Sequence, residues 1–167
     1  MGCRERLSGL DLCQGAPVRT WRQRGAKAQA IGISRGGQTT KVHIVTDVIG
    51  RPAVIHLTAG NASDVKVASE LVAAVPGRVR RLIADRGYDA DALRRELRSG
   101  GTRPIIPGRR TRKRPIRHDT TRYKDRWRIE AAFCRLKDFR RIATRYDKLA
   151  ANFASAVALA TVIAFWC

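Results

Sequence analysis

Residues 123–137, YKDRWRIEAAFCRLK, combine one carboxylate with several cationic side chains at a regular spacing. Arg126, Glu130 and Lys137 follow Tyr123 at offsets of 3, 7 and 14 residues. On an α-helix with about 100° per residue, these four side chains fall within a stripe of roughly 60°. The spacing therefore predicts a helix on which a phenol, a guanidinium, a carboxylate and an ammonium group share one face.

Two kinds of chemistry fit this stripe. Ile129, Phe133 and Leu136 form an apolar stripe beside it, which predicts a helix packed on a core. The polar stripe is then either a ladder of surface salt bridges or a metal-binding carboxylate with phosphate-binding neighbours. Mg²⁺ is commonly held by one or two carboxylates together with substrate phosphates, and Arg and Lys bind the same phosphates. Residue types alone leave both interpretations open.

A second candidate carboxylate follows a short apolar run. Leu82, Ile83 and Ala84 have the pattern of a buried strand, and Asp85 comes directly after them. The carboxyl ends of such strands form the crevice in which α/β sheets place their ligands. The alternative is that Asp85 only caps a turn that Gly87 permits. Asp89 is predicted to begin the next helix.

The charge of the chain indicates a polyanionic partner. The 167 residues carry a formal net charge of +20, with a sequence pI near 11.4. Residues 101–150 hold 17 Lys and Arg against five Asp and Glu. The run RRTRKRPIR at residues 109–117 is six-ninths basic, and predicts a DNA-phosphate contact with little sequence preference. The alternative is a solvated, flexible charge run. Candidate DNA-binding residues are Arg109, Arg110, Arg112, Lys113 and Arg114, with Arg35 in a Gly-rich loop.

Cysteine usage and hydropathy narrow the class of protein. The four cysteines include no CxxC pair, which predicts reduced thiols in a cytoplasmic protein. The apolar tail from residue 150 is short for a membrane span and contains polar residues, so we expect a buried helix and no membrane contact. His43 and His56 are expected to be structural, because no cluster of metal ligands accompanies them.

The remaining pattern predicts a single α/β domain. Residues 39–47 and 53–58 read as paired strands joined by a Gly-Pro turn, and a helix follows Ser63. Further strands are expected at residues 82–84 and 102–107, and a final apolar helix at residues 153–166. Residues 1–27 show no clear period and are predicted to be irregular, with Pro17 arguing against a central strand.

The pattern Y-x2-R-x3-E-x6-K at residues 123–137 resembles the signature of bacterial insertion-sequence DDE transposases, in the branch named after the Tyr-Arg-Glu-Lys motif. Three further segments resemble that family in the same order. They are IGISRGGQTTKVHIVTD at residues 31–47, LIADRGYD at residues 82–89 and FRRIATRYDKLAANF at residues 139–153. The resemblance runs from about Ala26 to Cys167 and fades before Ala26.

The resemblance implies a ribonuclease H-like mixed sheet flanked by helices, with residues 28–167 as the catalytic domain. It implies metal-dependent cleavage and strand transfer of double-stranded DNA, at transposon ends and target, with two Mg²⁺ (or Mn²⁺) ions. Asp85 and Glu130 would be the second and third carboxylates of the triad, and Tyr123, Arg126 and Lys137 would contact DNA. A bacterial, nucleoid-associated location and a homo-oligomer on DNA are further expectations of the resemblance.

The first carboxylate of the triad is the point at which the chain departs from the family. Asp11 is the single Asp before residue 47, and the residues after it do not match. If Asp11 does not lie beside Asp85, two ligands remain. The alternative function is then a catalytically inactive, basic DNA-binding remnant of a truncated or degenerate transposase. An RNA-binding protein of ribosomal type fits the charge but leaves the spacing around Glu130 unexplained.

Overall fold

The structure, a computed structural model, describes residues 10–17, 29–34 and 37–167, and only the backbone of residues 10–17. The chain divides into two units. Unit 1 comprises Met1–Asp11, Ile44–Val54 and Ser63–Glu130, and unit 2 comprises Leu12–His43, Ile55–Ala62 and Ala131–Cys167. Asp85 and Glu130 therefore belong to the same unit.

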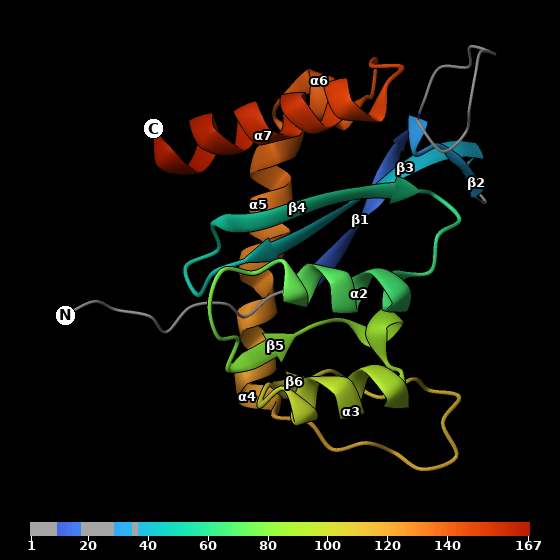
Figure 1. Cartoon of the computed structure of the whole chain (residues 1–167), viewed down its shortest axis with the longest axis vertical. Coiled ribbons are helices and arrows are strands. Elements are labelled where there is room, and N and C mark those ends of the chain that lie inside the picture. Colours follow the sequence, from blue (N-terminus) through green and yellow to red (C-terminus); the bar gives the residue numbers. More distant parts are fainter. Residues whose placement is uncertain (1–9, 18–28, 35–36) are drawn as a thin grey trace. The chain divides into compact units, whose positions relative to one another are not determined.

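A four-stranded sheet is built around one long central strand (Figure 1). Strand β3 (Gly37–Thr46) pairs with β1 (Leu10–Pro17), with β2 (Gly32–Ser34) and with β4 (Pro52–Ala59). The predicted strands at residues 39–47 and 53–58 are confirmed, and they pair. The expectation of an irregular segment before residue 28 is wrong for residues 10–17, where Pro17 occupies the last position of β1.

The turn between β3 and β4 is held by the side chain of Asp47, which follows β3. Asp47 Oδ1 accepts the backbone N–H groups of Ile49 at 3.0 Å and Arg51 at 2.9 Å, and Arg51 Nε donates to Oδ2 at 2.9 Å. Gly50 has a φ of 89°, which an L side chain rarely adopts. Asp47 thus stabilises a turn.

Unit 1 also contains a smaller, parallel sheet. Its strands are β5 (Arg81–Ile83) and β6 (Arg103–Ile105), in the register Ile83 opposite Ile105. The 3₁₀ helix η1 (Arg86–Tyr88) and helix α3 (Asp91–Ser99) follow β5, and helix α2 (Asp64–Ala73) contacts both of them. These elements bury apolar side chains, which include Leu71, Leu82, Ile83, Tyr88, Leu93, Leu97 and Ile105. The described fold is therefore mixed α/β.

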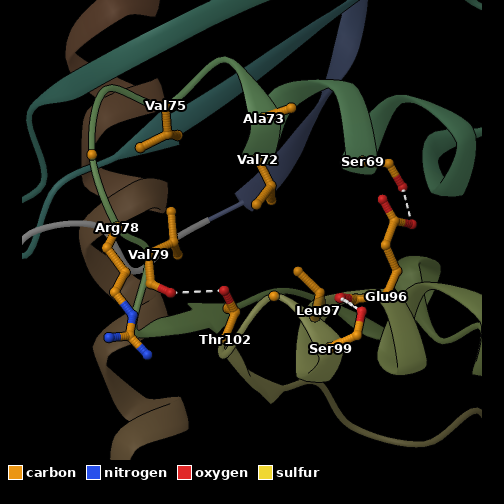
Figure 2. Close-up of a pocket in the computed structure, with 12 residues that line it drawn as sticks. Ser69, Val72, Ala73, Val75, Arg78, Val79, Glu96, Leu97, Ser99 and Thr102 are labelled. Atoms are coloured by element: carbon orange, nitrogen blue, oxygen red, sulfur yellow. Dashed lines mark hydrogen bonds between the residues drawn. The ribbon is translucent and has the colours of Figure 1, made fainter.

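Helices α2 and α3 border a groove of about 560 Å³ (Figure 2). Ser69 Oγ donates to Glu96 Oε2 at 2.6 Å and joins the two helices across it. Thr102 Oγ1 donates to the carbonyl oxygen of Val79 at 2.7 Å and joins the segments before β5 and β6. Neither candidate carboxylate, Asp85 nor Glu130, lines this groove. The groove is therefore separate from the candidate active site.

The predicted helix at residues 123–137 is interrupted. Helix α4 (Thr120–Tyr123) is followed by a 3₁₀ turn, η2 (Lys124–Arg126), and then by α5 (Trp127–Lys137). A 3₁₀ turn advances about 120° per residue, so side chains three residues apart, such as Tyr123 and Arg126, still point in about the same direction. From Arg126 to Glu130 the α-helical spacing is retained well enough for the two side chains to meet.

Two helices complete unit 2. Helices α6 (Arg140–Ala143) and α7 (Ala150–Trp166) contact each other, and Phe153 and Val157 of α7 are fully buried. The final apolar helix is thus confirmed, although Leu159 and Ile163 are exposed. Within the residues that the structure describes, no helix is both long enough and apolar enough to span a membrane.

Candidate active site

Asp85 is placed at the carboxyl end of buried strand β5, as predicted. Its Oδ1 accepts the backbone N–H of Gly87 at 2.7 Å, so the side chain caps helix η1. The residue is half-buried, next to the fully buried Ala84. Asp85 therefore does cap a turn, as the alternative interpretation predicted. This hydrogen bond fixes its carboxylate at the edge of the small sheet.

A second carboxylate lies next to Asp85. A Cβ atom added to Gly87 would lie 2.8 Å from Asp85 Oδ1 and 3.7 Å from Asp64 Oδ2. The missing side chain at Gly87 thus leaves a small space that both carboxylates border. Asp64 is the first residue of α2, and the sequence suggested only a helix start for it. Nothing in its linear position, 21 residues before Asp85, indicated this proximity.

Glu130 lies on the exposed side of α5. Its Oε1 accepts a hydrogen bond from Arg126 Nη1 at 2.6 Å, and its side chain is 56% exposed. The salt-bridge interpretation of the stripe is confirmed for this pair. A role for Glu130 in metal binding stays a prediction.

The structure does not test the complete triad. The side chain of Asp11 lies outside the described residues, although its backbone belongs to β1. Where side chains are described, at 29–34 and 37–167, no three His, Cys, Asp or Glu residues form a group that could hold a metal ion. The described carboxylates near Asp85 therefore amount to a pair.

The other members of the motif have diverse surroundings. The ring of Tyr123 packs edge-on against His118, with a centroid distance of 5.3 Å. Lys137 is exposed as the last residue of α5. Arg35, predicted to contact DNA, lies outside the described residues.

Asp89 is a buried centre of ion pairs, and the expectation that it begins helix α3 is wrong. Ala90 occupies the N-cap position of α3, and the Asp89 side chain is 0% exposed. Arg94 Nε donates to Oδ1 at 2.9 Å, and Arg112 donates to Oδ2 at 2.6 Å and to Oδ1 at 3.0 Å. The backbone N–H of Arg109 donates to Oδ2 at 2.8 Å. Three arginines from two chain segments, helix α3 and the basic run, therefore donate to one carboxylate.

The electrostatics follow from these bonds. Burial by itself would raise the pKa of Asp89, but the hydrogen bonds from Arg112, the Arg109 amide and Arg94 outweigh burial and lower the pKa to about 2. A hydrogen bond from Arg112 also lowers the pKa of Asp91, and both carboxylates raise the pKa of Arg112. Asp89 is thus ionised across the physiological pH range.

These contacts divide the basic side chains of residues 109–117 into ones paired with Asp89 and ones exposed to solvent. Arg112 is only 23% exposed and bound to Asp89 and Asp91, so the interpretation of a freely solvated run is wrong for this side chain. Arg110, Lys113 and Arg114 are exposed. Sequence reasoning missed the division because Asp89 precedes Arg109 and Arg112 by 20 and 23 residues, a separation with no local periodicity.

Comparison of the sequence with known proteins shows the family of the chain. Residues 13–165 match the sequence profile described as the transposase DDE domain. The chain belongs to this family. The matched range contains Asp85 and Glu130 and begins after Asp11, so Asp11 receives no support from it.

Individual relatives agree with the family. The chain is 37% identical over 121 residues to the protein named as the transposase for insertion sequence element IS402 of Burkholderia cepacia, covering 66% of this chain and 55% of that protein. It is 41% identical over 123 residues to the corresponding protein for IS6501 of Brucella ovis, covering 73% and 94%. The chain thus spans about half the length of the IS402 relative.

A solved structure supports the fold. The piggyBac transposase in its synaptic complex with hairpin DNA superposes with a TM-score of 0.59 at 10% identity, covering 95% of this chain and 47% of that one. At this level of identity the similarity concerns the fold alone.

Proposed function

We propose that this DDE domain catalyses metal-dependent cleavage and transfer of DNA strands in the transposition of an insertion sequence. The observation that carries the proposal is Asp85, held by the Gly87 amide at the end of a buried strand with Asp64 beside it. Carboxylates at such a strand end suit a site for a ligand of opposite charge. The proposed fold is the ribonuclease H-like one, in which Asp11 of β1 and Glu130 of α5 would join Asp85 as the first and third carboxylates of the triad.

The donor set around Asp85 fits Mg²⁺ or Mn²⁺. Carboxylate oxygens are the ligands that these ions prefer, and one or two of them suffice when substrate phosphates complete the coordination. Asp85 and Glu130 would hold the ions, and Asp11 of β1 would be the remaining ligand of the triad. When bound, two such ions would supply charge stabilisation at phosphorus and activation of the attacking hydroxyl group.

The cationic residues would bind and orient the DNA. Arg126 neutralises Glu130 and, with Lys137, would bind phosphates of the scissile strand, while Tyr123 would pack against a sugar. The exposed side chains of Arg110, Lys113 and Arg114 would add sequence-independent affinity for double-stranded DNA. A homo-oligomer on paired DNA ends is part of the proposal.

Nicking of supercoiled plasmid tests the proposal. We expect Mg²⁺- or Mn²⁺-dependent nicking by the purified chain, and its loss in Asp85→Asn and Glu130→Gln. Asp138→Asn and Glu70→Gln are matched controls, since both are exposed carboxylates with no side-chain partner among the described residues. Equal nicking by all five proteins would contradict the proposal. DNA binding without nicking by the unmodified chain would favour the inactive remnant.

A further inference from the structure

Two basic side chains of the 109–117 run are bound to the turn that carries Asp85. We use the name Asp89 clasp for Asp89, Arg94, Arg109 and Arg112. We propose that the Asp89 clasp positions the Asp85 carboxylate relative to the DNA-binding loop. The inference rests on the proposed metal-binding role of Asp85 and assigns positioning residues outside the carboxylate set.

A continuous path of hydrogen bonds joins Asp89 to Asp85. The Asp89 carboxylate accepts the backbone N–H of Arg109 at 2.8 Å. The guanidinium of Arg109 donates through Nη2 to the carbonyl oxygen of Gly87 at 2.8 Å and through Nε to that of Arg86 at 3.3 Å. The N–H of Gly87 in turn donates to Asp85 Oδ1 at 2.7 Å. Arg109 therefore holds the residue whose amide holds Asp85.

The clasp also fixes three segments to one point. Arg94 comes from α3 and donates through Nη2 to the carbonyl oxygen of Ile106, directly after β6, at 2.7 Å. Arg112 comes from the basic loop and pairs with both Asp89 and Asp91. A buried carboxylate is stable only when such partners satisfy it. Movement of the loop would remove the donors Arg109 and Arg112 from the Asp89 carboxylate and leave Arg94 as the ion-pair partner described for this buried charge.

The remaining loop cations differ from the clasp. Arg110, Lys113 and Arg114 are exposed, and no side-chain partner for them occurs within the described segments of the chain. The basic side chains of the loop thus fall into two groups with different roles. Arg109 and Arg112 set its position, and its exposed cations reach phosphates.

Matched Arg→Lys variants separate positioning from charge. Arg112→Lys keeps the charge but cannot reproduce the two-bond contact of a guanidinium with Asp89. Arg110→Lys is the control in the same loop. We expect amide hydrogen exchange of Gly87, followed by NMR, to become about tenfold faster in Arg112→Lys and to stay unchanged in Arg110→Lys. Exchange of the β5 amides, measured in the same experiment, shows whether a variant changes the stability of the whole chain. Equal exchange at Gly87 in both variants would overturn the clasp.

Mn²⁺ titration of the chain without DNA, followed by electron paramagnetic resonance, gives a second readout. Arg112→Lys should weaken Mn²⁺ binding by about tenfold, as loss of an outer-shell partner does, with its DNA affinity kept. Arg110→Gln should weaken DNA binding and leave Mn²⁺ binding unchanged. Asp85→Asn is the reference. If Asp85→Asn binds Mn²⁺ normally, the proposed metal function fails, while the Gly87 exchange still decides the clasp. If Asp85→Asn loses Mn²⁺ binding while Arg112→Lys binds Mn²⁺ as tightly as the unmodified chain, the positioning role is overturned.

Discussion

Gly87 contacts the Asp85 carboxylate through its backbone and lies beside Asp64 as well. Its amide holds Asp85, its carbonyl accepts Arg109, and its missing side chain leaves the space that Asp64 and Asp85 border. No positive φ is required there. The residue is therefore glycine because of its neighbours rather than its backbone conformation.

This view predicts the effect of Gly87→Ala. The added methyl group would lie 2.8 Å from Asp85 Oδ1, closer than a carbon and an oxygen approach without displacement. We expect Mn²⁺ affinity to fall by about tenfold, measured by the same titration. Gly100→Ala is the control, because its added carbon would meet only ordinary contacts at 3.6 Å. Equal affinity in the two variants would show that the space at Gly87 has no part in metal binding.

At the scale of elements, the periodicity of apolar residues predicted those strands and helices that depend on interactions between residues near in sequence. The paired strands β3 and β4, the strand before Asp85 and the final helix followed from apolar patterning and turn residues. The interruption at Lys124–Arg126 did not, because a 3₁₀ turn differs from an α-helix only in bonding residues three apart instead of four, which residue types barely signal. Asp89 was misassigned because two of its partners, Arg109 and Arg112, lie 20 and 23 residues away in the sequence.

Arg145 joins the elements of unit 2 and gives a prediction about stability. It is 1% exposed, and its guanidinium donates to Thr40 and to the carbonyl oxygens of Gln29, Asp147 and Lys148. It also lies over the ring of Phe153, and burial lowers its pKa.

Arg145→Lys should lower the free energy of unfolding by about 3 kcal/mol, because an ammonium group cannot satisfy these acceptors together. Urea unfolding followed by circular dichroism measures the change. Arg140→Lys, at an exposed site, should stay within about 0.5 kcal/mol of the unmodified chain. A similarly small change in Arg145→Lys would mean that the buried guanidinium is replaceable.

For the whole molecule, the net charge of +20 predicts a polyanionic partner from composition alone. Composition could not show which cations are available, because that depends on ion pairs such as Arg112 with Asp89. The exposed loop cations are the ones that we expect to reach DNA.

Changing Arg110, Lys113 and Arg114 together to Ala should therefore reduce the slope of log affinity against log salt by up to about 3. Fluorescence anisotropy with two unrelated duplexes should show equal losses for both sequences. Ala substitutions at Lys66, Arg95 and Arg98, exposed on α2 and α3, remove the same charge as a control. An equal slope change in the control would mean that the overall charge, rather than the loop, binds DNA.

The central claim is that Asp85 binds the catalytic metal, and Asp85→Cys tests it most directly. A thiolate ligand is poorly matched to Mg²⁺ and is accepted better by the softer Mn²⁺. We predict that Asp85→Cys loses plasmid nicking in Mg²⁺ and regains a measurable part of it in Mn²⁺, whereas Asp85→Asn stays inactive in both. Equal nicking by Asp85→Cys in the two metals, at the level of the unmodified chain, would contradict the account.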